Sequence, residues 1–241
     1  RPVLSMLRRE QKASRIRDLN LGNMGFIARF RIRQMLREMR SAFAVIFGMF
    51  VSMLIVMMGL DIYVMCQNVN IENKADTKFA YMYTYKYPTE EVPDGGEEAF
   101  GKTLKKERLG YNLDVTLLGI HDDNPYFDAK VEDGKNKIVI STAVAQKYNV
   151  GEGDVFVLND EETDTKYAFD IVGIAQYSSS LYIFMDIDSM RELFGEDDDY
   201  YKVVFADHKL NIPSGRLYGT LKKSEVEKNS DIFVNMMMPM V

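Results

Sequence analysis

The strongest constraint in this sequence is an uncharged apolar run from Ser41 to Leu60. The run is rich in Val, Ile, Leu, Met and Phe and contains no Asp, Glu, Lys or Arg. At a rise of about 1.5 Å per residue, a helix of about 20 residues crosses the roughly 30 Å hydrocarbon core of a bilayer. A buried helix of a soluble protein is the alternative, but a soluble helix this long normally carries a polar stripe. The run therefore predicts a membrane-spanning helix, which we place at residues 41–66.

The charges on either side of this run give the predicted span a direction. The segment 26–40, directly before Ser41, includes five arginines, whereas the segment 61–75, directly after Leu60, includes a single base, Lys74. Residues 1–40 as a whole carry 11 Lys and Arg against 3 Asp and Glu. Basic residues accumulate on the cytoplasmic side of a span. The N-terminal part is therefore predicted to be cytoplasmic, and the part after the span extracytoplasmic.

The segment before the span divides into two parts. Residues 1–25 are polar and basic without an apolar period, and they are predicted to form a cytoplasmic linker. Residues 26–40 carry apolar residues at helical spacing, which predicts an amphipathic juxtamembrane helix along the inner leaflet. Nucleic-acid binding is the other interpretation of so many arginines, and their position directly before a span argues against it. The side chains predicted to lie among the lipid headgroups are those of Arg29, Arg33, Arg37 and Arg40.

A second apolar run, residues 231–241, ends the sequence and predicts the start of a second span. Because the sequence opens on Arg1 and stops inside this run, we expect it to be a piece of a longer membrane protein. The first run is not typical of a cleavable signal peptide, since the whole of segment 1–40 precedes it. Between the runs, residues 67–230 are long enough for one domain with its own core. Cys66 is the single cysteine, so this core is expected to hold without an intrachain disulfide.

Alternating aromatic residues mark the first predicted strand of this domain. From Phe79 to Tyr87 every second residue is aromatic, which is the period of a strand with one aromatic face. Such a face could stack a ligand, but we favour the interpretation that it covers the core. Residues 88–96 have loop composition, and Leu113–Ile120 is predicted to be the next strand.

The segment from Lys137 to Leu158 has the pattern of a strand, a helix, a tight turn and a second strand. The helix is expected to be capped by Ser141 or Thr142. The turn is predicted to consist of Gly151, Gly153 and Asp154, with at least one glycine at positive φ.

The rest of the domain is predicted to alternate short strands with one short helix. Asp186 or Asp188 is expected to cap that helix. Lys223–Asp231 is predicted to begin a helix that leads into the second span, and no Gly or Pro interrupts the sequence between Asp61 and Phe79. Because uninterrupted helices are stiff, we expect the two connections to the spans to pack side by side. Further strands are expected at residues 167–174, 181–185, 201–205 and 216–221.

Residues 96–103 match the pattern G-x-x-x-x-G-K-[ST] of phosphate-binding loops. The positions that would hold a nucleotide are Gly96, Gly101, Lys102 and Thr103. Such a loop follows a buried strand and opens a helix, so that its amides converge on the phosphates. Here loop-like residues precede the motif, and Glu97 and Glu98 would place carboxylates against a polyphosphate. The match is therefore interpreted as chance, no cofactor is predicted, and Lys102→Ala is expected to leave folding and function nearly unchanged.

Other chemical motifs are weak. His121 and His208 lie far apart without the spacing of zinc ligands, and the acidic loop Glu196–Asp199 lacks the alternating ligands of a calcium site. Ser178–Ser180 lacks the G-x-S-x-G frame of a hydrolase. We therefore predict no catalytic residue and no metal ligand.

The order of these parts resembles that of the FtsX/MacB-type permeases of ABC transporters. The resemblance rests on a basic helix before a span and on the pattern IxxAVAxKYxVGxGD at residues 140–154, followed by FMDIDSMRELFG at residues 184–195. In addition, PVLSMLRR at residues 2–9 is similar to the linker that precedes the second half of large Gram-positive permeases. The fold class implied is α+β, with an extracytoplasmic mixed α/β domain of the MacB periplasmic-core type inserted between two spans.

The resemblance also implies a function. The chain would belong to a permease subunit in a bacterial cell membrane, which relays ATPase-driven motion to the outer domain for export or mechanotransmission. The implied partners are a separate ATP-binding subunit, membrane lipid and a second permease copy or half, but not nucleic acid. The subunit itself would not be an enzyme. The alternatives are a membrane-anchored extracellular sensor or binding module without transport and, with less support, an extracellular NTPase built on residues 96–103.

Overall fold

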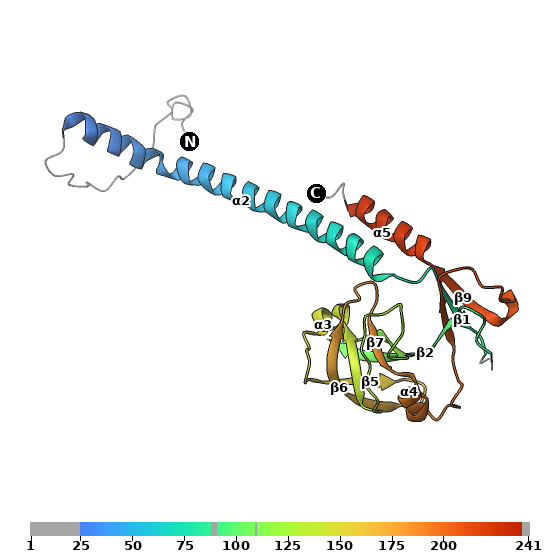
Figure 1. The fold of residues 1–241 in the computed structure, drawn as a ribbon. Coiled ribbons are helices and arrows are strands. Elements are labelled where there is room, and N and C mark those ends of the chain that lie inside the picture. Colours follow the sequence, from blue (N-terminus) through green and yellow to red (C-terminus); the bar gives the residue numbers. More distant parts are fainter. Residues whose placement is uncertain (1–24, 88–90, 109, 238–241) are drawn as a thin grey trace, which may run out of the picture. The chain divides into compact units, whose positions relative to one another are not determined.

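A computed structural model describes residues 25–87, 91–108 and 110–237 of the chain (Figure 1). The chain divides into two compact units, residues 1–61 and residues 62–241. Nearly all of the predicted linker, and the last four residues of the predicted second span, lie outside the described residues.

A single long helix, α2 (Phe26–Asp76), contains both the predicted juxtamembrane helix and the predicted span. It continues to Asp76, beyond the predicted end of the span at residue 66, and its residues 62–76 belong to the second unit. Among the described helices, one segment, Ser41–Asp76, is long and apolar enough to cross a membrane. The side chains of the four arginines assigned to the headgroups lie outside the described part of the structure, so their role stays a prediction.

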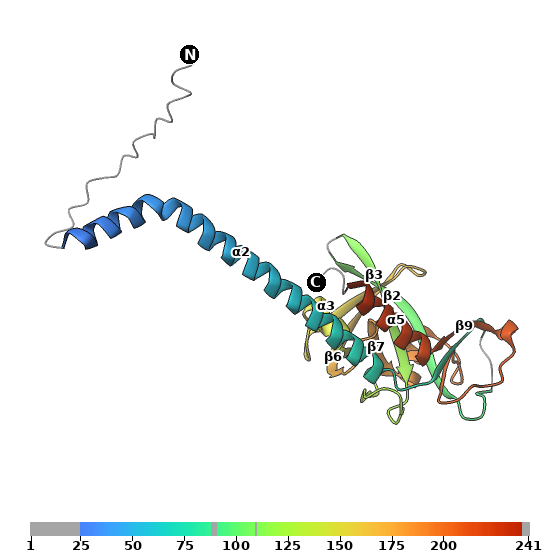
Figure 2. The same cartoon turned by 90° about the horizontal axis from the view of Figure 1, so that it is seen from above.

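Six strands of the second unit close into a barrel. They are β2 (Glu97–Arg108), β3 (Tyr111–Ile120), β4 (Lys137–Ser141), β5 (Val155–Asp160), β6 (Thr165–Ala175) and β7 (Tyr182–Asp186). The strand order is β3-β7-β4-β6-β5-β2, and β2 pairs back to β3 in a long antiparallel hairpin (Figure 2). The β3–β7 and β4–β6 pairs are parallel, and the other pairs are antiparallel. The closure leaves no unpaired strand edge around the described ring.

The interior of the barrel is an apolar core. Phe156 and Leu158 on β5 alternate with exposed residues, as do Phe169 and Ile171 on β6, and all four are at most 2% exposed. Two short helices, α3 (Thr142–Tyr148) and α4 (Ile187–Phe194), add residues such as Met190 to the same cluster. Full burial of one such side chain contributes about 1.5–3 kcal/mol, so a core of this kind stabilises the domain without a disulfide.

A second, antiparallel sheet shares β2 with the barrel. Its strands run in the order β9 (Leu217–Lys222), β1 (Tyr81–Tyr85), β8 (Val203–Ala206) and the first residues of β2. One face packs against the barrel through Phe127, whose ring centroid lies 5.0 Å from that of Phe184 and 5.1 Å from that of Phe205. A separate cluster, which includes Tyr83 and Tyr85, covers the other face.

The aromatic face of the first predicted strand is largely buried. Phe79, Tyr83 and Tyr85 are at most 4% exposed, whereas Tyr87 is 72% exposed. Burial raises the pKa of Tyr85 to about 12, with a further contribution from Tyr201. The interpretation of this strand as a cover for the core is therefore confirmed for these three residues.

The predicted capping and turn residues around α3 and α4 adopt the predicted conformations. The Ser141 side chain caps α3 by accepting a hydrogen bond from the Val144 amide, and Asp186 caps α4 in the same way. In the turn before β5, Gly153 has a φ of +89°, which confirms the expectation of positive φ at one glycine. The Asp154 carboxylate accepts a hydrogen bond of 2.8 Å from the amide of Gly151, which closes the turn. The turn residues therefore serve backbone geometry.

The last strand of the second sheet continues directly into the last described helix. After a single 3-10 turn at Ser214–Arg216, β9 ends at Lys222 and α5 (Lys223–Met237) begins at the next residue. The helix predicted from Lys223 is thus present and extends past residue 231. The arrangement of the domain between two spans stays a prediction.

Candidate functional site

The final turns of α2 and the helix α5 lie side by side in the second unit (Figures 1 and 2). The side-chain amide of Asn70 donates a hydrogen bond of 3.0 Å to Asp231, and the Lys74 ammonium lies 2.6 Å from the same carboxylate oxygen. The amide of Asn73 donates to the Ser230 hydroxyl at 3.3 Å. These contacts confirm the expected packing of the two helical connections.

The spacing of the polar residues on α2 explains this pairing. Asn70, Asn73 and Asp76 recur every three residues and therefore share one face of the helix. Cys66 lies one turn before Asn70 and is 2% exposed, while Val234 on α5 is 6% exposed. Buried apolar residues thus continue the contact face of each helix beyond the polar contacts, toward the N-terminus of α2 and the C-terminus of α5.

Asp76 joins the end of α2 to the barrel. Its Oδ2 atom accepts hydrogen bonds of 2.7 Å from both the backbone amide and the hydroxyl of Ser178. The Gln176 side chain donates to the same oxygen at 3.5 Å. One turn earlier, the backbone carbonyl of Asn73 accepts a hydrogen bond of 3.4 Å from the Ser179 hydroxyl. We call the contact between Asn73, Asp76 and the loop at residues 176–180 the helix–barrel joint.

The barrel side of this joint is anchored in the core. Tyr177 is 4% exposed, and its ring stacks on that of Tyr182 with centroids 5.1 Å apart. The backbone amide of Tyr177 donates a hydrogen bond of 3.2 Å to the Thr142 hydroxyl. Burial, together with the neighbouring Tyr182 ring, raises the pKa of Tyr177 far above its ordinary range, which keeps the phenol neutral. A displacement of Asp76 therefore acts on a loop that is fixed to the barrel.

The same two helices are also attached to neighbouring strands of the second sheet. Residues 77–80 connect α2 to β1, and β9 continues directly into α5. The Lys223 amide donates a hydrogen bond of 3.0 Å to the Ala80 carbonyl, which ties the two connections together. The helix pair thus has two attachments: one to the barrel through the helix–barrel joint, and one to the sheet through β1 and β9.

The residues of the phosphate-loop pattern do not form a phosphate loop. Residues 97–103 lie within β2, in extended conformation, and pair with β3 and β8. An extended strand directs successive amides to opposite sides, so these amides do not converge on one anion. Lys102 is held by Asp160, whose carboxylate lies 3.0 Å from its ammonium and is 2% exposed. Gly101, Lys102 and Thr103 thus serve strand pairing and an ion pair, whereas Gly96 precedes the strand and donates its amide to the Pro93 carbonyl.

This ion pair changes the expectation for Lys102→Ala. Burial raises the pKa of Asp160, but hydrogen bonds from Lys102 and the Glu162 amide outweigh it and hold the pKa below its ordinary value of 3.8. Removal of Lys102 would leave this carboxylate buried without its cation. We therefore expect Lys102→Ala to destabilise the fold at pH 7 by about 1–2 kcal/mol, contrary to the neutral effect predicted from the sequence.

The pH dependence of this effect has a definite sign. A carboxyl group whose pKa is lowered by folding stabilises the fold above its ordinary pKa and loses that contribution as the pH falls through its folded pKa. The difference between wild type and Lys102→Ala should therefore shrink below pH 3.8. Urea unfolding of the full chain in detergent micelles, followed by tyrosine fluorescence, measures it. Lys105→Ala, which removes a contact with the exposed Asp114, is the control, and an equal loss in both variants at pH 7 would contradict the prediction.

The remaining candidate residues of the sequence lie apart. His121 contacts Glu98 at 3.1 Å, and Glu98 also accepts from the buried Arg191, which ties β2 to α4. His208 follows β8 and lies near Gly95. Within the described part of the chain, no group of three His, Cys, Asp or Glu residues is placed to hold a metal ion.

Sequence reasoning missed the residues of the helix–barrel joint. Ser178 was considered only as part of a hydrolase motif, which was rejected, and Asp76 was not singled out. The sequence does contain a signal for them, because Asn70, Asn73 and Asp76 form a polar stripe at the end of α2, after its uncharged segment Ser41–Leu60. Such a stripe predicts a packed polar face, but the partner loop lies about 100 residues away in sequence.

Comparisons with known proteins give distant structural likenesses, of which two are described here. No protein-family model matches the chain, and no curated protein matches it. The extracellular domain of the noncanonic ABC-type transporter YknZ from Gram-positive bacteria is similar, with 15% identity and a TM-score of 0.36, covering 56% of this chain and 86% of that one. The periplasmic region of MacB from Actinobacillus actinomycetemcomitans is similar with 6% identity and a TM-score of 0.38, covering 64% of this chain and 93% of that one. At these identities and TM-scores, neither likeness carries an argument about function.

Proposed function

We propose that this chain is part of a permease subunit of an ABC transporter, in which α2 and α5 relay motion from the cytoplasmic side to an outer domain. The observation that supports this most directly is the double attachment of the helix pair. α2 ends on the barrel, where Asp76 accepts hydrogen bonds from Ser178. A short connection, residues 77–80, leads from α2 to β1, and β9 continues directly into α5.

A relay needs stiff parts and fixed ends. α2 is helical from Phe26 to Asp76 without a break, and a continuous helix transmits a displacement that a Gly/Ser linker would absorb. The two helices are attached to different parts of the domain: α2 to the barrel through Asp76, and α5 to the second sheet through β9. A shift of α2 relative to α5 would therefore be converted into a change between the barrel and the second sheet.

The proposal includes the partners and the location implied by the resemblance. ATP hydrolysis is assigned to a separate ATP-binding subunit, because residues 97–103 of the nucleotide-like motif are built into β2. The uncharged segment from Ser41 to Leu60 is assigned to the membrane of a bacterial cell, with the arginines before it at the inner headgroups and the second unit outside. The chain itself is assigned no catalytic role.

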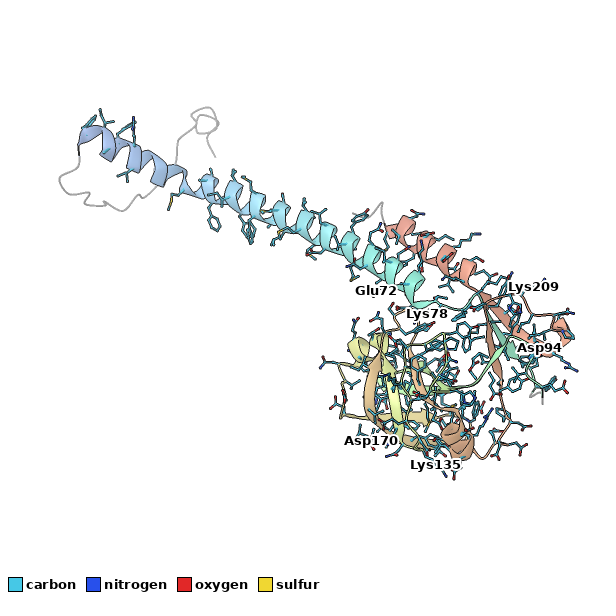
Figure 3. The ribbon with its side chains drawn as sticks, viewed as in Figure 1. Glu72, Lys78, Asp94, Lys135, Asp170 and Lys209 are labelled. Atoms are coloured by element: carbon cyan, nitrogen blue, oxygen red, sulfur yellow. The ribbon has the colours of Figure 1, made fainter. Side chains whose placement is uncertain are left out.

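The test follows distances within the second unit during the ATPase cycle. Spin labels are placed on the exposed residues Lys135 and Lys209 in one sample, and on Glu72 and Lys209 in another (Figure 3). The Cys66→Ala background removes the only cysteine. The protein is isolated with its ATP-binding subunit and reconstituted in bilayers. We expect ATP with vanadate to shift at least one of the two distance distributions.

Two results would contradict the proposal. If no ATP-binding subunit is isolated with the protein, the permease assignment fails and the membrane-anchored sensor becomes the better interpretation. If the subunit is present and hydrolyses ATP while both distances stay constant, the permease assignment survives and the relay fails.

A further inference from the structure

The outer strand of the second sheet, β9, has a free edge. Among the described residues, β9 is paired with β1 alone and stands at the end of the strand order. Its residues Leu217–Leu221 carry no charge and no proline, and Tyr218 is 81% exposed. Proteins usually protect edges with charge, proline or a bulge in the strand centre, because an unprotected edge is a template for another strand. The bulge of this pair lies only at the start of β9, opposite Thr84 and Tyr85.

The register shows which backbone groups face outward. Lys223 donates its amide to the Ala80 carbonyl, and the register places Met82 opposite Leu221 and Thr84 opposite Gly219. Hydrogen-bonded and non-hydrogen-bonded pairs alternate in an antiparallel ladder. The amides and carbonyls of Leu221 and Gly219 therefore face β1, and those of Thr220 and Lys222 face outward. The Lys222 amide already donates a hydrogen bond of 3.4 Å to the Glu225 carboxylate, which leaves the Thr220 amide and carbonyl for a partner.

A cleft opens beside this edge, between the sheet and the barrel. It has a volume of about 730 Å³, within the range of ligand pockets. Its lining combines apolar and aromatic side chains from both parts, among them Met82, Phe100, Tyr182 and Tyr200. The exposed side chains of Tyr218 and Tyr87 line it from the sheet side. The cleft also has polar lining residues, such as Lys86 and Lys202, so it is mixed in character. Exposed tyrosines are enriched at protein-binding sites.

The charges along the edge select the kind of partner. Arg216 and Lys86 lie at the start of β9, where the Lys86 amide donates to the Arg216 carbonyl, and Lys222 and Lys223 lie at its other end. No acidic residue occurs between Ser214 and Ser224, but Glu225 in the first turn of α5 lies 3.5 Å from the Lys222 ammonium and offsets its charge. The positive charge of this edge therefore rests on Lys86, Arg216 and Lys223. Glu162 and Glu196 line the cleft from the barrel side. A partner strand with acidic residues at its ends therefore complements the edge of β9 itself.

A second copy of the chain fits this edge poorly. Antiparallel pairing of two β9 strands would place Arg216 of one copy beside Lys222 of the other. Parallel pairing would place Arg216 beside Arg216. Like charges directly opposite each other destabilise a strand pair in either case.

We propose that the free edge of β9 and the adjoining cleft form a docking site for an extended segment of a partner protein. The segment adds to the sheet as a further strand, through hydrogen bonds with the outward amide and carbonyl of Thr220. It places an aromatic or branched aliphatic side chain in the cleft, against Tyr218, and it carries acidic residues at its ends. This mode takes its affinity from the backbone and its specificity from the side-chain pocket. It does not depend on the relay proposed above.

The probe is a synthetic blocked peptide, Glu-Val-Thr-Phe-Thr-Val-Glu, titrated against the full chain in detergent micelles by fluorescence anisotropy. The decisive variant is Thr220→Pro, which removes one outward amide without removing a hydrogen bond of the β1–β9 ladder. Thr220→Val keeps the amide and is the matched control. We expect Thr220→Pro and Tyr218→Ala to weaken binding about tenfold or more, and Thr220→Val to change it less than about twofold. A peptide with N-methyl groups on alternate residues lacks the amides that strand addition needs, and it should not bind. Because this peptide is tested on the unchanged chain, it checks the proposal even if Thr220→Pro impairs folding.

Four results of the peptide titration would overturn the proposal. They are absence of binding by the probe, equal binding to Thr220→Pro in a folded chain, equal binding of the N-methylated peptide, and equal binding of a peptide with Lys in place of both Glu residues. Self-association of the chain that Thr220→Pro abolishes would also overturn it, since the occupant would then be a second copy.

Discussion

Insertion of seven Gly and Ser residues after Asp61 is expected to abolish the ATP-driven distance change within the second unit while leaving that unit folded. The site precedes the contacts of α2 with α5 and with the barrel, which begin at Cys66 and Asn70 and end at Asp76. A flexible segment here absorbs a displacement before it reaches the helix–barrel joint. The measurement is the label pair on Lys135 and Lys209, which joins the barrel to the second sheet, in the reconstituted complex with and without ATP and vanadate.

The matched control is a helical insertion of the same length and position, built from Ala with one Glu and one Lys. Seven residues add about two turns and return the helix to nearly the same phase. We expect this variant to keep the distance change that the flexible insertion removes. ATP hydrolysis should persist in both, because neither insertion alters the cytoplasmic side. A full distance change with the flexible insertion would show that motion reaches the domain by another route.

Local signals in the sequence were sufficient for several elements of the fold. The uncharged run predicted the centre of α2, Ser141 the start of α3, and the Gly151–Asp154 turn the start of β5. Each of these depends on neighbouring residues only. A cap satisfies amides within its own helix turn, and a glycine at positive φ is required by its own backbone.

The strand β2 could not be predicted in this way. Its residues Glu97–Arg108 are rich in Glu and Lys, and Leu104 alone among the residues after Phe100 is fully buried. Charged residues are tolerated because the outer face of the barrel is exposed, and because partners such as Asp160 and Asp114 come from other strands. The stabilising contacts of β2 are with β3, β5 and β8, which depend on long-range closure of the barrel.

The candidate site shows the same limit. The stiffness of the two helical connections followed from the absence of Gly and Pro, and so did their expected packing. The helix–barrel joint could not be predicted from the sequence, because Ser178 lies beside Asp76 only through the positions of β6 and β7 in the barrel. A polar stripe on α2 indicates that something packs there, but the fold alone identifies the loop at residues 176–180 as the partner.

Replacement of Asp76 by Ala is expected to detach the end of α2 from the barrel. Asp76 Oδ2 accepts from three donors, and two of them, the Ser178 amide and hydroxyl, lie at 2.7 Å. Their loss leaves donors unpaired in a largely buried place, which costs about 2 kcal/mol. Hydrogen exchange of the amides at residues 70–77, measured on the full chain in micelles, should accelerate about tenfold or more, and the ATP-driven distance change should fall in parallel.

The variant Asp231→Ala distinguishes the contribution of the helix–barrel joint from that of the pairing between α2 and α5. Asp231 is a half-exposed carboxylate that accepts from Asn70 and Lys74, and exposed pairs contribute little to stability. We therefore expect a much smaller acceleration of exchange in α2 and a retained distance change. Asp76→Asn keeps one acceptor for the Ser178 amide and should lie between the two Ala variants. If Asp231→Ala loosens the end of α2 as much as Asp76→Ala does, the pairing with α5 is the principal attachment, and motion would then enter the domain through β9 rather than through the loop at residues 176–180.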